Sequence, residues 1–303
     1  MYSCLVSYHI NPYTCGVARF NQTLSRAMSV PLVQLDVFLA KPPSGRALLS
    51  LKLEEIATES LSNLKSAVRA KQITFDVFLH ASDGSSLENE LCLAAAKVFA
   101  ASAEIAAQTK VSRSDVIACF APGAPVLPEL ARVDCRLLTF GMAHKIRSEG
   151  YRRLASLVRH DRRRFRLEIS TALHEGGTFD ESFFTINAEI SSSFGGEVSF
   201  LGFLADVEVS ERLREASALI AFFPGGVREN NTTVLSAMTH GCPVITNLDA
   251  DSPPWMRHGE TIFDVNSLEE FPSEEELERV GIAGMHVASE FNFRRLAEVL
   301  LKS

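Results

Sequence analysis

The sequence predicts an α/β protein with two doubly wound parallel sheets, and two observations on the 303-residue chain lead to this expectation. Short apolar runs with the length of buried strands alternate with stretches of helical length, which is the rhythm of βαβ units. This alternation of strands and helices is interrupted at residues 122–134, which contain three prolines and a glycine, and it resumes after them. Because 303 residues exceed the usual size of one domain, we expect two domains joined by this linker.

The first domain is predicted to span residues 1–121. Apolar runs bounded by turn-forming residues indicate its strands, and amphipathic stretches indicate its helices. We expect strands at Leu5–Tyr8, Val33–Leu39, Phe75–Leu79, Lys97–Ala101 and Val116–Phe120, and helices at Ala18–Met28, Ser50–Ala70 and Ala103–Lys110.

The second domain is predicted to span residues 135–285 and to repeat the alternation. Its strands are expected at Arg136–Phe140, Leu167–Thr171, Val198–Leu201, Ala218–Phe223 and Val244–Asn247. Two amphipathic segments, Glu274–Met285 and Asn292–Leu301, close the chain and are predicted to be helical. We expect residues 286–303 to pack back onto the first domain.

A polar loop between a buried strand and an apolar helix is the most informative feature of the second domain. Pro224, Gly225 and Gly226 end the strand, and a helix is expected from about Thr232. The first N–H groups of a helix have no partner within it and lie at the positive end of its dipole, so they attract anions. The junction is therefore a natural site for a phosphate or a diphosphate.

The side chains of this loop fit the same ligand. Arg228 supplies a positive charge beside the helix start. The polar residues at the start of the helix are Asn230, Asn231, Thr232 and Thr233. A plain helix cap is the alternative interpretation. The ligand site is favoured because a second buried strand follows the helix, and ligands of such βαβ units bind at the strand ends.

The bulk composition argues against several classes of function. A net charge of −7 disfavours a large nonspecific nucleic-acid surface, because such binding depends on neutralising phosphates. No segment reaches the roughly eighteen uninterrupted apolar residues of a membrane span, and the N-terminus lacks the charged start of a secretory signal. We therefore expect a soluble cytoplasmic protein without a membrane span.

The cysteines and histidines do not suggest a metal site. The six cysteines contain no CxxC pair and are expected to be small buried hydrophobic residues. The eight histidines are scattered, without an HxxxH or HExxH pattern. No metal ion is expected.

A basic cluster runs from Arg147 to Arg166. At helical spacing, with Leu154 and Leu157 between the arginines, it is interpreted as a solvated helix face. A polyanion site is the alternative. Nucleic acid is thus a partner that the sequence permits but does not favour.

Over nearly its whole length the chain resembles glycosyltransferases of the GT-B fold. The pattern that carries the resemblance is two similar α/β domains, a Pro/Gly linker and a C-terminal βαβ unit with the polar loop. The segment LSAMTHGCPVI, Leu235 to Ile245, is similar to the end of the motif E-G-x-x-x-P-x-x-E-A-M-x-x-G-x-P-V-I of the retaining, nucleotide-sugar-dependent group, glycosyltransferase group 1. The resemblance implies two Rossmann-like domains facing each other across a cleft.

The first half of that motif differs in this chain. Aligning the two sequences on AMxxGxPVI places Arg228 and Ser236 where the family has its two glutamates, and Glu229 is one residue out of register. The family uses those acids on the donor sugar and the nucleotide ribose. The resemblance therefore implies that Glu229, Ser236 and the segment from Asn230 to Thr233 hold the donor in a different way.

One further stretch resembles part of the family's donor domain. The segment TFGMAHKIR, from Thr139, is similar to the strand and loop that carry a glycine and a basic residue on the diphosphate, which implies Gly141 with Lys145 or Arg147. A cation there would neutralise charge on the leaving diphosphate without a metal. A helix-start lysine exposed to solvent is the alternative for Lys145.

The first domain offers two candidates on the same resemblance. NPYTCGVARF is similar to the glycine-containing loop after the first strand, where Gly16 would let the backbone approach the donor phosphates; a plain turn glycine is the alternative. His80 ends a strand where the family often carries an active-site histidine, although a histidine at a strand end is otherwise unremarkable. Weaker candidates are Glu175 and the turn at Asp249 and Asp251.

The sequence thus predicts a metal-independent hexosyl- or pentosyltransferase that takes its sugar from a nucleotide diphosphate-sugar and needs no cofactor besides that substrate. Lys145, Arg228 and His80 are its predicted catalytic residues. The acceptor is left open among a glycan, a lipid, a peptide, a metabolite and a DNA base, and so are the stereochemistry and the oligomeric state. The alternatives are a degenerate GT-B protein that binds a nucleotide-sugar or a partner without transfer, and a nucleotide-sugar epimerase.

Overall fold

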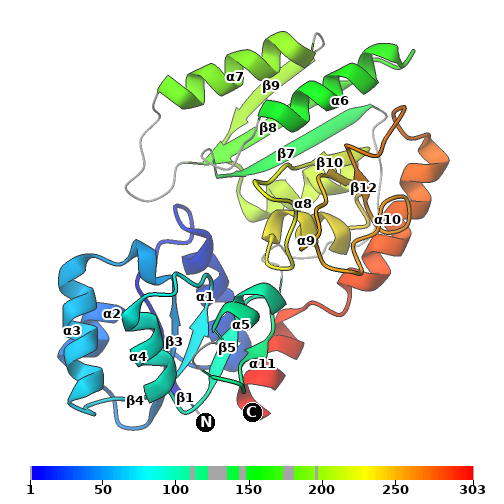
Figure 1. The fold of residues 1–303 in the computed structure, drawn as a ribbon. Coiled ribbons are helices and arrows are strands. Elements are labelled where there is room, and N and C mark those ends of the chain that lie inside the picture. Colours follow the sequence, from blue (N-terminus) through cyan, green and yellow to red (C-terminus); the bar gives the residue numbers. More distant parts are fainter. Residues whose placement is uncertain are drawn as a thin grey trace. The chain divides into compact units, whose positions relative to one another are not determined.

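The computed structural model describes residues 2–109, 113–121, 135–142, 148–172, 181–194 and 197–302. The chain divides into two compact units, Met1–Ala121 with Phe291–Ser303, and Pro122–Glu290. Within the described residues, each unit contains one parallel six-stranded sheet with helices against it (Figure 1). The predicted α/β class with two doubly wound sheets is confirmed.

The sheet of the first unit has the strand order β2-β1-β3-β4-β5-β6. Its strands are β1 Tyr2–Ser7, β2 Leu32–Gln34, β3 Arg46–Leu51, β4 Thr74–Leu79, β5 Val98–Ala100 and β6 Ile117–Ala118. Its helices are α1 Gly16–Met28, α2 Leu35–Ala40, the 3-10 turn η1 Leu53–Glu55, α3 Thr58–Arg69, α4 Ser86–Ala94, α5 Ala103–Thr109 and α11 Phe293–Lys302. In Figure 1, α1 and α11 lie side by side against one face of the sheet, and α2, α3 and α4 form a row on the other.

Two predictions for the first unit are wrong. The expected strand at Val33–Leu39 stops at Gln34 and continues as α2, because the Gln34 side chain accepts hydrogen bonds from two N–H groups of the first turn and starts a helix. The expected helix at Ser50–Ala70 begins only at Thr58, and its first residues belong to β3. The short apolar run of β3 fits a strand or a helix equally well, so only its place in the sheet decides.

The sheet of the second unit has the strand order β12-β11-β10-β7-β8-β9. Its strands are β7 Arg136–Met142, β8 Arg166–Ala172, β9 Glu197–Gly202, β10 Ala218–Ile220, β11 Val244–Thr246 and β12 Phe263–Asp264. Its helices are α6 Ser148–His160, α7 Glu181–Phe194, α8 Asp206–Glu215, α9 Thr232–Thr239 and α10 Glu274–Ala288. Strands are present at all five predicted places, but β10 ends at Ile220 instead of Phe223; the helix start at Thr232 is confirmed. Helices α6 and α7 lie on the face of the sheet opposite α8 and α9 (Figure 1).

The strand orders locate one topological switch point in each sheet. In the second unit the chain proceeds from β7 outward through β8 and β9 and then continues on the other side with β10, so the switch lies between β7 and β10. In the first unit it lies between β1 and β3, which are paired. Ligands of doubly wound sheets bind outside the carboxyl ends of the strands at such points.

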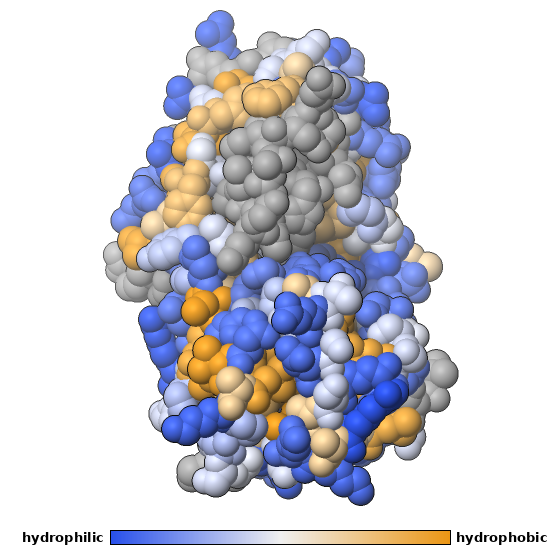
Figure 2. All heavy atoms as spheres, turned by 90° about the vertical axis from the view of Figure 1, so that its left-hand side faces the viewer, coloured by the Kyte–Doolittle hydropathy of each residue, from blue (hydrophilic) through white to orange (hydrophobic). Residues whose placement is uncertain are grey.

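On the side of the first unit where α2 and α3 lie, hydrophobic side chains gather in patches between hydrophilic ones (Figure 2). Much of the surface of any folded protein is apolar, so these patches alone do not define a docking face. Among the described helices, none is long and apolar enough to cross a membrane.

Candidate functional site

The switch point of the second unit brings together the end of β7 and the first turn of α9. Thr233, in that turn, donates a hydrogen bond from Oγ1 to the carbonyl oxygen of Phe140 at 3.5 Å. A Cβ added at Gly141 would lie 3.7 Å from the same hydroxyl, and Gly141 has a φ of +149°. Two residues predicted from separate motifs, Gly141 and Thr233, are therefore neighbours.

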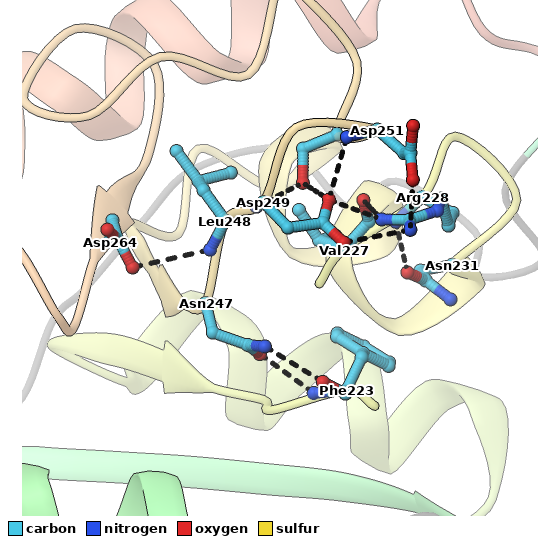
Figure 3. Close-up of polar contacts among 10 residues, drawn as sticks. Phe223, Val227, Arg228, Asn231, Asn247, Leu248, Asp249, Asp251 and Asp264 are labelled. Atoms are coloured by element: carbon cyan, nitrogen blue, oxygen red, sulfur yellow. Dashed lines mark hydrogen bonds and ion pairs between the residues drawn. The ribbon is translucent and has the colours of Figure 1, made fainter. Parts of the chain in front are cut away.

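Asn247 holds the beginning of the polar loop against the loop that follows β11. Its side-chain nitrogen donates to the carbonyl oxygen of Phe223 at 2.8 Å, and its side-chain oxygen accepts from the Phe223 N–H at 2.8 Å (Figure 3). The N–H of Val227 donates to the Asn247 carbonyl oxygen at 3.0 Å. These bonds continue the pairing of β10 and β11 beyond the ends of the strands. The sequence predicts a strand through Asn247, but β11 ends at Thr246, and the Asn247 side chain makes this contact instead.

Arg228 lies at the centre of this region and forms a bidentate pair with Asp249. Its Nη1 and Nη2 donate to the two carboxylate oxygens at 2.8 and 2.9 Å, and Nη2 lies 3.7 Å from Asp251 (Figure 3). The hydrogen bonds from Arg228 hold the pKa of Asp249 below its usual range. The side chain of Arg228 is 18% exposed, so its guanidinium is oriented yet still reached by solvent.

The polar turn predicted at Asp249 is present, and its hydrogen bonds hold the Asp249 carboxylate that pairs with Arg228. Asp249 Oδ1 also accepts hydrogen bonds from the Asp251 N–H at 3.1 Å and from Ser252 Oγ at 3.0 Å. A carboxylate with so many donors is held in one orientation. The loops after β10 and β11 therefore form one connected polar platform.

The N-terminus of α9 is not capped by the side chain that precedes it. Asn231 Oδ1 accepts from the backbone N–H of Arg228 at 2.6 Å and makes no bond to the first turn of the helix. Thr232 is exposed, and Glu229 and Asn230 are half-buried. Because a helix cannot pair its own first N–H groups, this end is suited to an anion.

Ser236 differs from the other residues predicted in this loop. It lies in α9 and is only 3% exposed. The position at which the family has its second glutamate therefore belongs to the packed side of the helix rather than to the polar surface of the loop.

Two predicted cations and one weak candidate cannot be placed. Lys145, Arg147 and Glu175 lie outside the described residues. Helix α6 begins at Ser148, directly after the segment that carries the two cations. Their assignment to a diphosphate remains a prediction.

Two arginines of the basic cluster, one in α6 and one in the turn after it, make contacts within the second unit. Arg153 Nη2 donates to the carbonyl oxygen of Leu268 at 2.5 Å. Arg163 forms a bidentate pair with Asp161 and lies 5.3 Å from the ring centroid of Phe165. These contacts favour the structural interpretation of the basic cluster over a polyanion site.

In the first unit, Gly16 and His80 lie at the carboxyl-end side of the sheet. Gly16 is exposed and is the first residue of α1, and a Cβ added to it would meet nothing within 4 Å. His80 directly follows β4, and its Nε2 lies 3.0 Å from Ser50 Oγ. Burial, together with the nearby positive charge of Lys52, lowers the pKa of His80 to about 3, so the ring is neutral at pH 7.

A metal centre is not formed by the part of the chain that the structure describes. No group of three or more histidine, cysteine, aspartate or glutamate residues is arranged there to hold an ion. Positive charge and N–H groups are what the second unit offers to an anionic ligand.

No protein-family model matches the chain, and no curated protein sequence matches it. Solved structures match it over its full length. HepE of Anabaena, solved with UDP and glucose, is 13% identical, with 100% of both chains covered and a TM-score of 0.67. The lipopolysaccharide outer core galactosyltransferase WaaB is 14% identical, with 100% of this chain and 99% of WaaB covered and a TM-score of 0.61.

A third similar structure is an alpha-glucosyltransferase in complex with UDP and a 13-mer DNA containing an HMU base. It is 11% identical, with 99% of this chain and 98% of that chain covered and a TM-score of 0.63. The chain therefore has the GT-B fold of glycosyltransferases, as the sequence resemblance implied.

Proposed function

We propose that the chain is a glycosyltransferase that moves a sugar from a nucleotide diphosphate-sugar to an acceptor. One observation carries the proposal. At the switch point of the second unit, the first turn of α9, which the Asn231 side chain does not cap, adjoins Gly141 near the end of β7, and the loop before α9 carries the oriented guanidinium of Arg228. This combination binds a diphosphate by charge and by N–H donors.

The residue roles follow from the charge that develops during transfer. The leaving nucleoside diphosphate gains negative charge, and groups that meet this charge in the transition state speed the reaction. Arg228 and the first turn of α9 take this role, together with Lys145 or Arg147. Because these groups are cationic or N–H donors, the reaction needs no metal. The first unit binds the acceptor.

We infer that the donor is a UDP-hexose. HepE and the alpha-glucosyltransferase of the same fold were solved with UDP, HepE also with glucose, and WaaB is a galactosyltransferase. A thermal-shift screen tests this inference with UDP-, GDP-, TDP- and ADP-sugars. A ligand at a hundred times its Kd stabilises by about 2.7 kcal/mol, so one nucleotide class should raise the melting temperature clearly.

Two substitutions, Arg228→Ala and Asp249→Asn, distinguish the effect of the positive charge of Arg228 from the effect of its ion pair with Asp249. Both substitutions break the ion pair, but only the first removes the cation. Charge-assisted hydrogen bonds contribute about 1.5–3 kcal/mol, so Arg228→Ala should weaken UDP binding about tenfold to a hundredfold. Asp249→Asn keeps the cation and an amide oxygen that can still accept a hydrogen bond from it, so UDP binding should weaken by a smaller factor. Isothermal titration with UDP measures both. Equal losses in the two variants would contradict a direct contact between Arg228 and the diphosphate.

Turnover distinguishes an enzyme from a degenerate binder. An active glycosyltransferase should hydrolyse its UDP-sugar slowly without an acceptor, and NMR of the released sugar would show whether the anomeric configuration is retained. Binding without hydrolysis or transfer would instead favour the degenerate GT-B protein. Interconversion of two UDP-sugars would favour the epimerase.

Gly16→Ala tests the approach of the donor phosphates to the first unit. The new methyl group has open space, and the residue lies at a helix start, so the melting temperature should not fall. If the phosphates approach the backbone here, kcat/KM for the UDP-sugar should drop about tenfold or more. A variant with unchanged kcat/KM would show that Gly16 is a plain turn glycine.

A further inference from the structure

Two carboxylates are buried among the residues of the second unit that the structure describes, and they are held in different ways. Glu168 in β8 is 3% exposed and accepts a hydrogen bond from the Arg212 guanidinium at 3.0 Å. Asp264, the last residue of β12, is 8% exposed and accepts hydrogen bonds from N–H and hydroxyl groups. A buried carboxylate persists only where its partners compensate for the lost water, so the partners of Asp264 show what it holds in place.

The carboxylate of Asp264 joins two separate loops. Its Oδ2 accepts from Ser267 Oγ at 2.7 Å and its Oδ1 from the Asn266 N–H at 3.2 Å, both in the turn after β12. Oδ1 also accepts from the N–H of Leu248 at 3.3 Å, and Leu248 precedes Asp264 by 16 positions (Figure 3). All three partners donate, as a carboxylate requires. The loop after β11 is thereby tied to the turn after β12.

The bond to Leu248 continues the contact between β11 and β12 beyond the ladder. Thr246 and Asp264 are the last paired residues of the two strands. Two residues further along β11, the side chain of Asp264 receives the N–H of Leu248. On the opposite flank, the side chain of Asn247 binds the backbone of Phe223. The chain that leaves β11 is therefore held from both sides at two consecutive residues.

The turn that starts at Asp249 depends on this hold for its placement. The Asp249 N–H donates to Ser252 Oγ at 3.1 Å, and Asp249 Oδ1 accepts from Ser252 Oγ and from the Asp251 N–H. These bonds are internal, so they fix the shape of the turn but not its position. Leu248 is the residue directly before the turn. Holding its N–H therefore fixes where the Asp249 carboxylate lies when it pairs with Arg228.

Asp264 is itself anchored by groups outside that turn. Its backbone N–H donates to Nδ1 of His258 at 3.0 Å, and its carbonyl oxygen accepts from the Ser267 N–H at 3.1 Å. Its backbone also lies in the ladder with β11. A carboxylate with several donors keeps one orientation. Asp264 is therefore a fixed point to which the loop after β11 is attached.

We propose that Asp264 is a positioning residue of the donor site: its carboxylate holds the Leu248 N–H, fixes the direction in which the chain leaves β11, and so keeps the Asp249 carboxylate against Arg228. The proposal rests on the glycosyltransferase function proposed above. In this role Asp264 does not contact the donor; it acts through Asp249 and Arg228.

Hydrogen exchange of the full chain, followed by mass spectrometry, tests the positioning without any ligand. Asp264→Ala should speed exchange in peptides that cover residues 247–252 about threefold to tenfold, and peptides of α9 should be unchanged. The reporting amides are those of Leu248, Asp249, Asp251 and Ser252. Unchanged exchange of residues 247–252 in a folded Asp264→Ala variant would overturn the proposal.

Two control variants separate the bond to Leu248 from other effects. Glu168→Ala removes the other buried carboxylate of the unit, and Ser267→Ala removes a hydrogen bond to Asp264 while the oxygen that faces Leu248 stays. Both should leave the exchange of residues 247–252 unchanged. A rise in either variant as large as in Asp264→Ala would mean that general loosening of the unit, and not the bond to Leu248, controls the loop.

Asp264→Asn and Asp264→Leu keep the test decisive if Asp264→Ala does not fold. Both keep the branched shape of the side chain. Asparagine retains an oxygen that can accept from Leu248, so exchange of residues 247–252 should stay near that of the unaltered chain. Leucine removes every acceptor, so exchange should rise. A folded Asp264→Asn variant with exchange raised more than about threefold would contradict the acceptor role.

Titration with UDP shows whether the positioning serves the donor. Asp264→Ala should weaken UDP binding about twofold to tenfold. In the Arg228→Ala background the same substitution should change the Kd by less than about twofold, because the cation that it positions is gone. A general structural role would give the same loss in both backgrounds, and that result would refute the positioning role.

The two measurements distinguish failure of the proposal from failure of the proposed function. A loop that loosens in Asp264→Ala while the UDP affinity is unchanged would refute the positioning role and leave the proposed function standing. If the unaltered chain bound neither UDP nor any nucleotide-sugar, the proposed function would fail. Hydrogen exchange would then still decide whether Asp264 holds the loop after β11.

Discussion

Gly226→Ala should disrupt the polar platform of the second unit while its neighbour Gly225→Ala should not. A Cβ at Gly226 would lie 2.6 Å from Cγ and 2.7 Å from Oδ1 of Asp249, so the carboxylate that orients Arg228 must move. The residue also has a φ of +86°, which an alanine adopts only with strain. We expect a loss of about 2–4 kcal/mol in the stability of the second unit, together with loss of UDP binding.

Gly225→Ala is a close control for this experiment. Gly225 has a φ of +67°, so an alanine there suffers comparable backbone strain. Its Cβ would meet only Arg228 Nη2 and Asp249 Oδ2, both at 3.8 Å, which is ordinary contact. Urea unfolding and UDP titration of both variants measure the difference, which isolates the collision with Asp249. If the two variants lost stability and UDP affinity equally, the Arg228–Asp249 arrangement would not matter for the ligand.

The parts of the site that could be predicted from sequence are those set by local patterns. The start of α9 at Thr232 follows from polar residues before an apolar stretch. Pro224 and two glycines predict the loop after β10, although the strand itself ends earlier, at Ile220. His80 is a candidate because it directly follows an apolar strand at a position where the family that the chain resembles often carries an active-site histidine. Each of these signals spans fewer than about ten residues.

The contacts that hold the site together join residues far apart in the chain, and the sequence did not reveal them. Asn247 reaches Phe223 across 24 positions, and Asp249 reaches Arg228 across 21. Both pairings depend on β10 and β11 lying side by side, which is a property of the folded sheet. An amide and a carboxylate after a buried strand suggest a turn on their own, and only the neighbouring loop gives them a partner.

The same reason explains the missed strand β3. Its six residues, RALLSL, form an apolar run without a clear period, and the sequence assigned the last two to a helix. The run is a strand because β1 and β4 pair with it on both sides. Without β3, the contact between Ser50 and Asn21, 29 residues apart, could not be foreseen.

Gly150→Ala should destabilise the second unit although alanine is the better helix former. Gly150 lies in the first turn of α6, and a Cβ there would be 2.2 Å from Cγ of the buried ring of Phe222. The ring also packs edge-on against Tyr151 at 5.1 Å, so it has little room to turn away. Helix propensity favours the substitution by about 1 kcal/mol, but overpacking of a core costs about 1–3 kcal/mol and sometimes more. We expect a net loss of about 2 kcal/mol in urea unfolding.

A double-mutant cycle with Phe222→Leu shows whether the collision is the cause. Leucine is smaller than phenylalanine, so Gly150→Ala should cost much less, or become stabilising, in the Phe222→Leu background. Additive losses would mean that Gly150 is needed for another reason. The contact also bears on the ligand, because Phe222 precedes Phe223, which Asn247 holds at the start of the polar loop. A shift of α6 against Phe222 should therefore weaken UDP binding in Gly150→Ala, and Phe222→Leu should restore part of it.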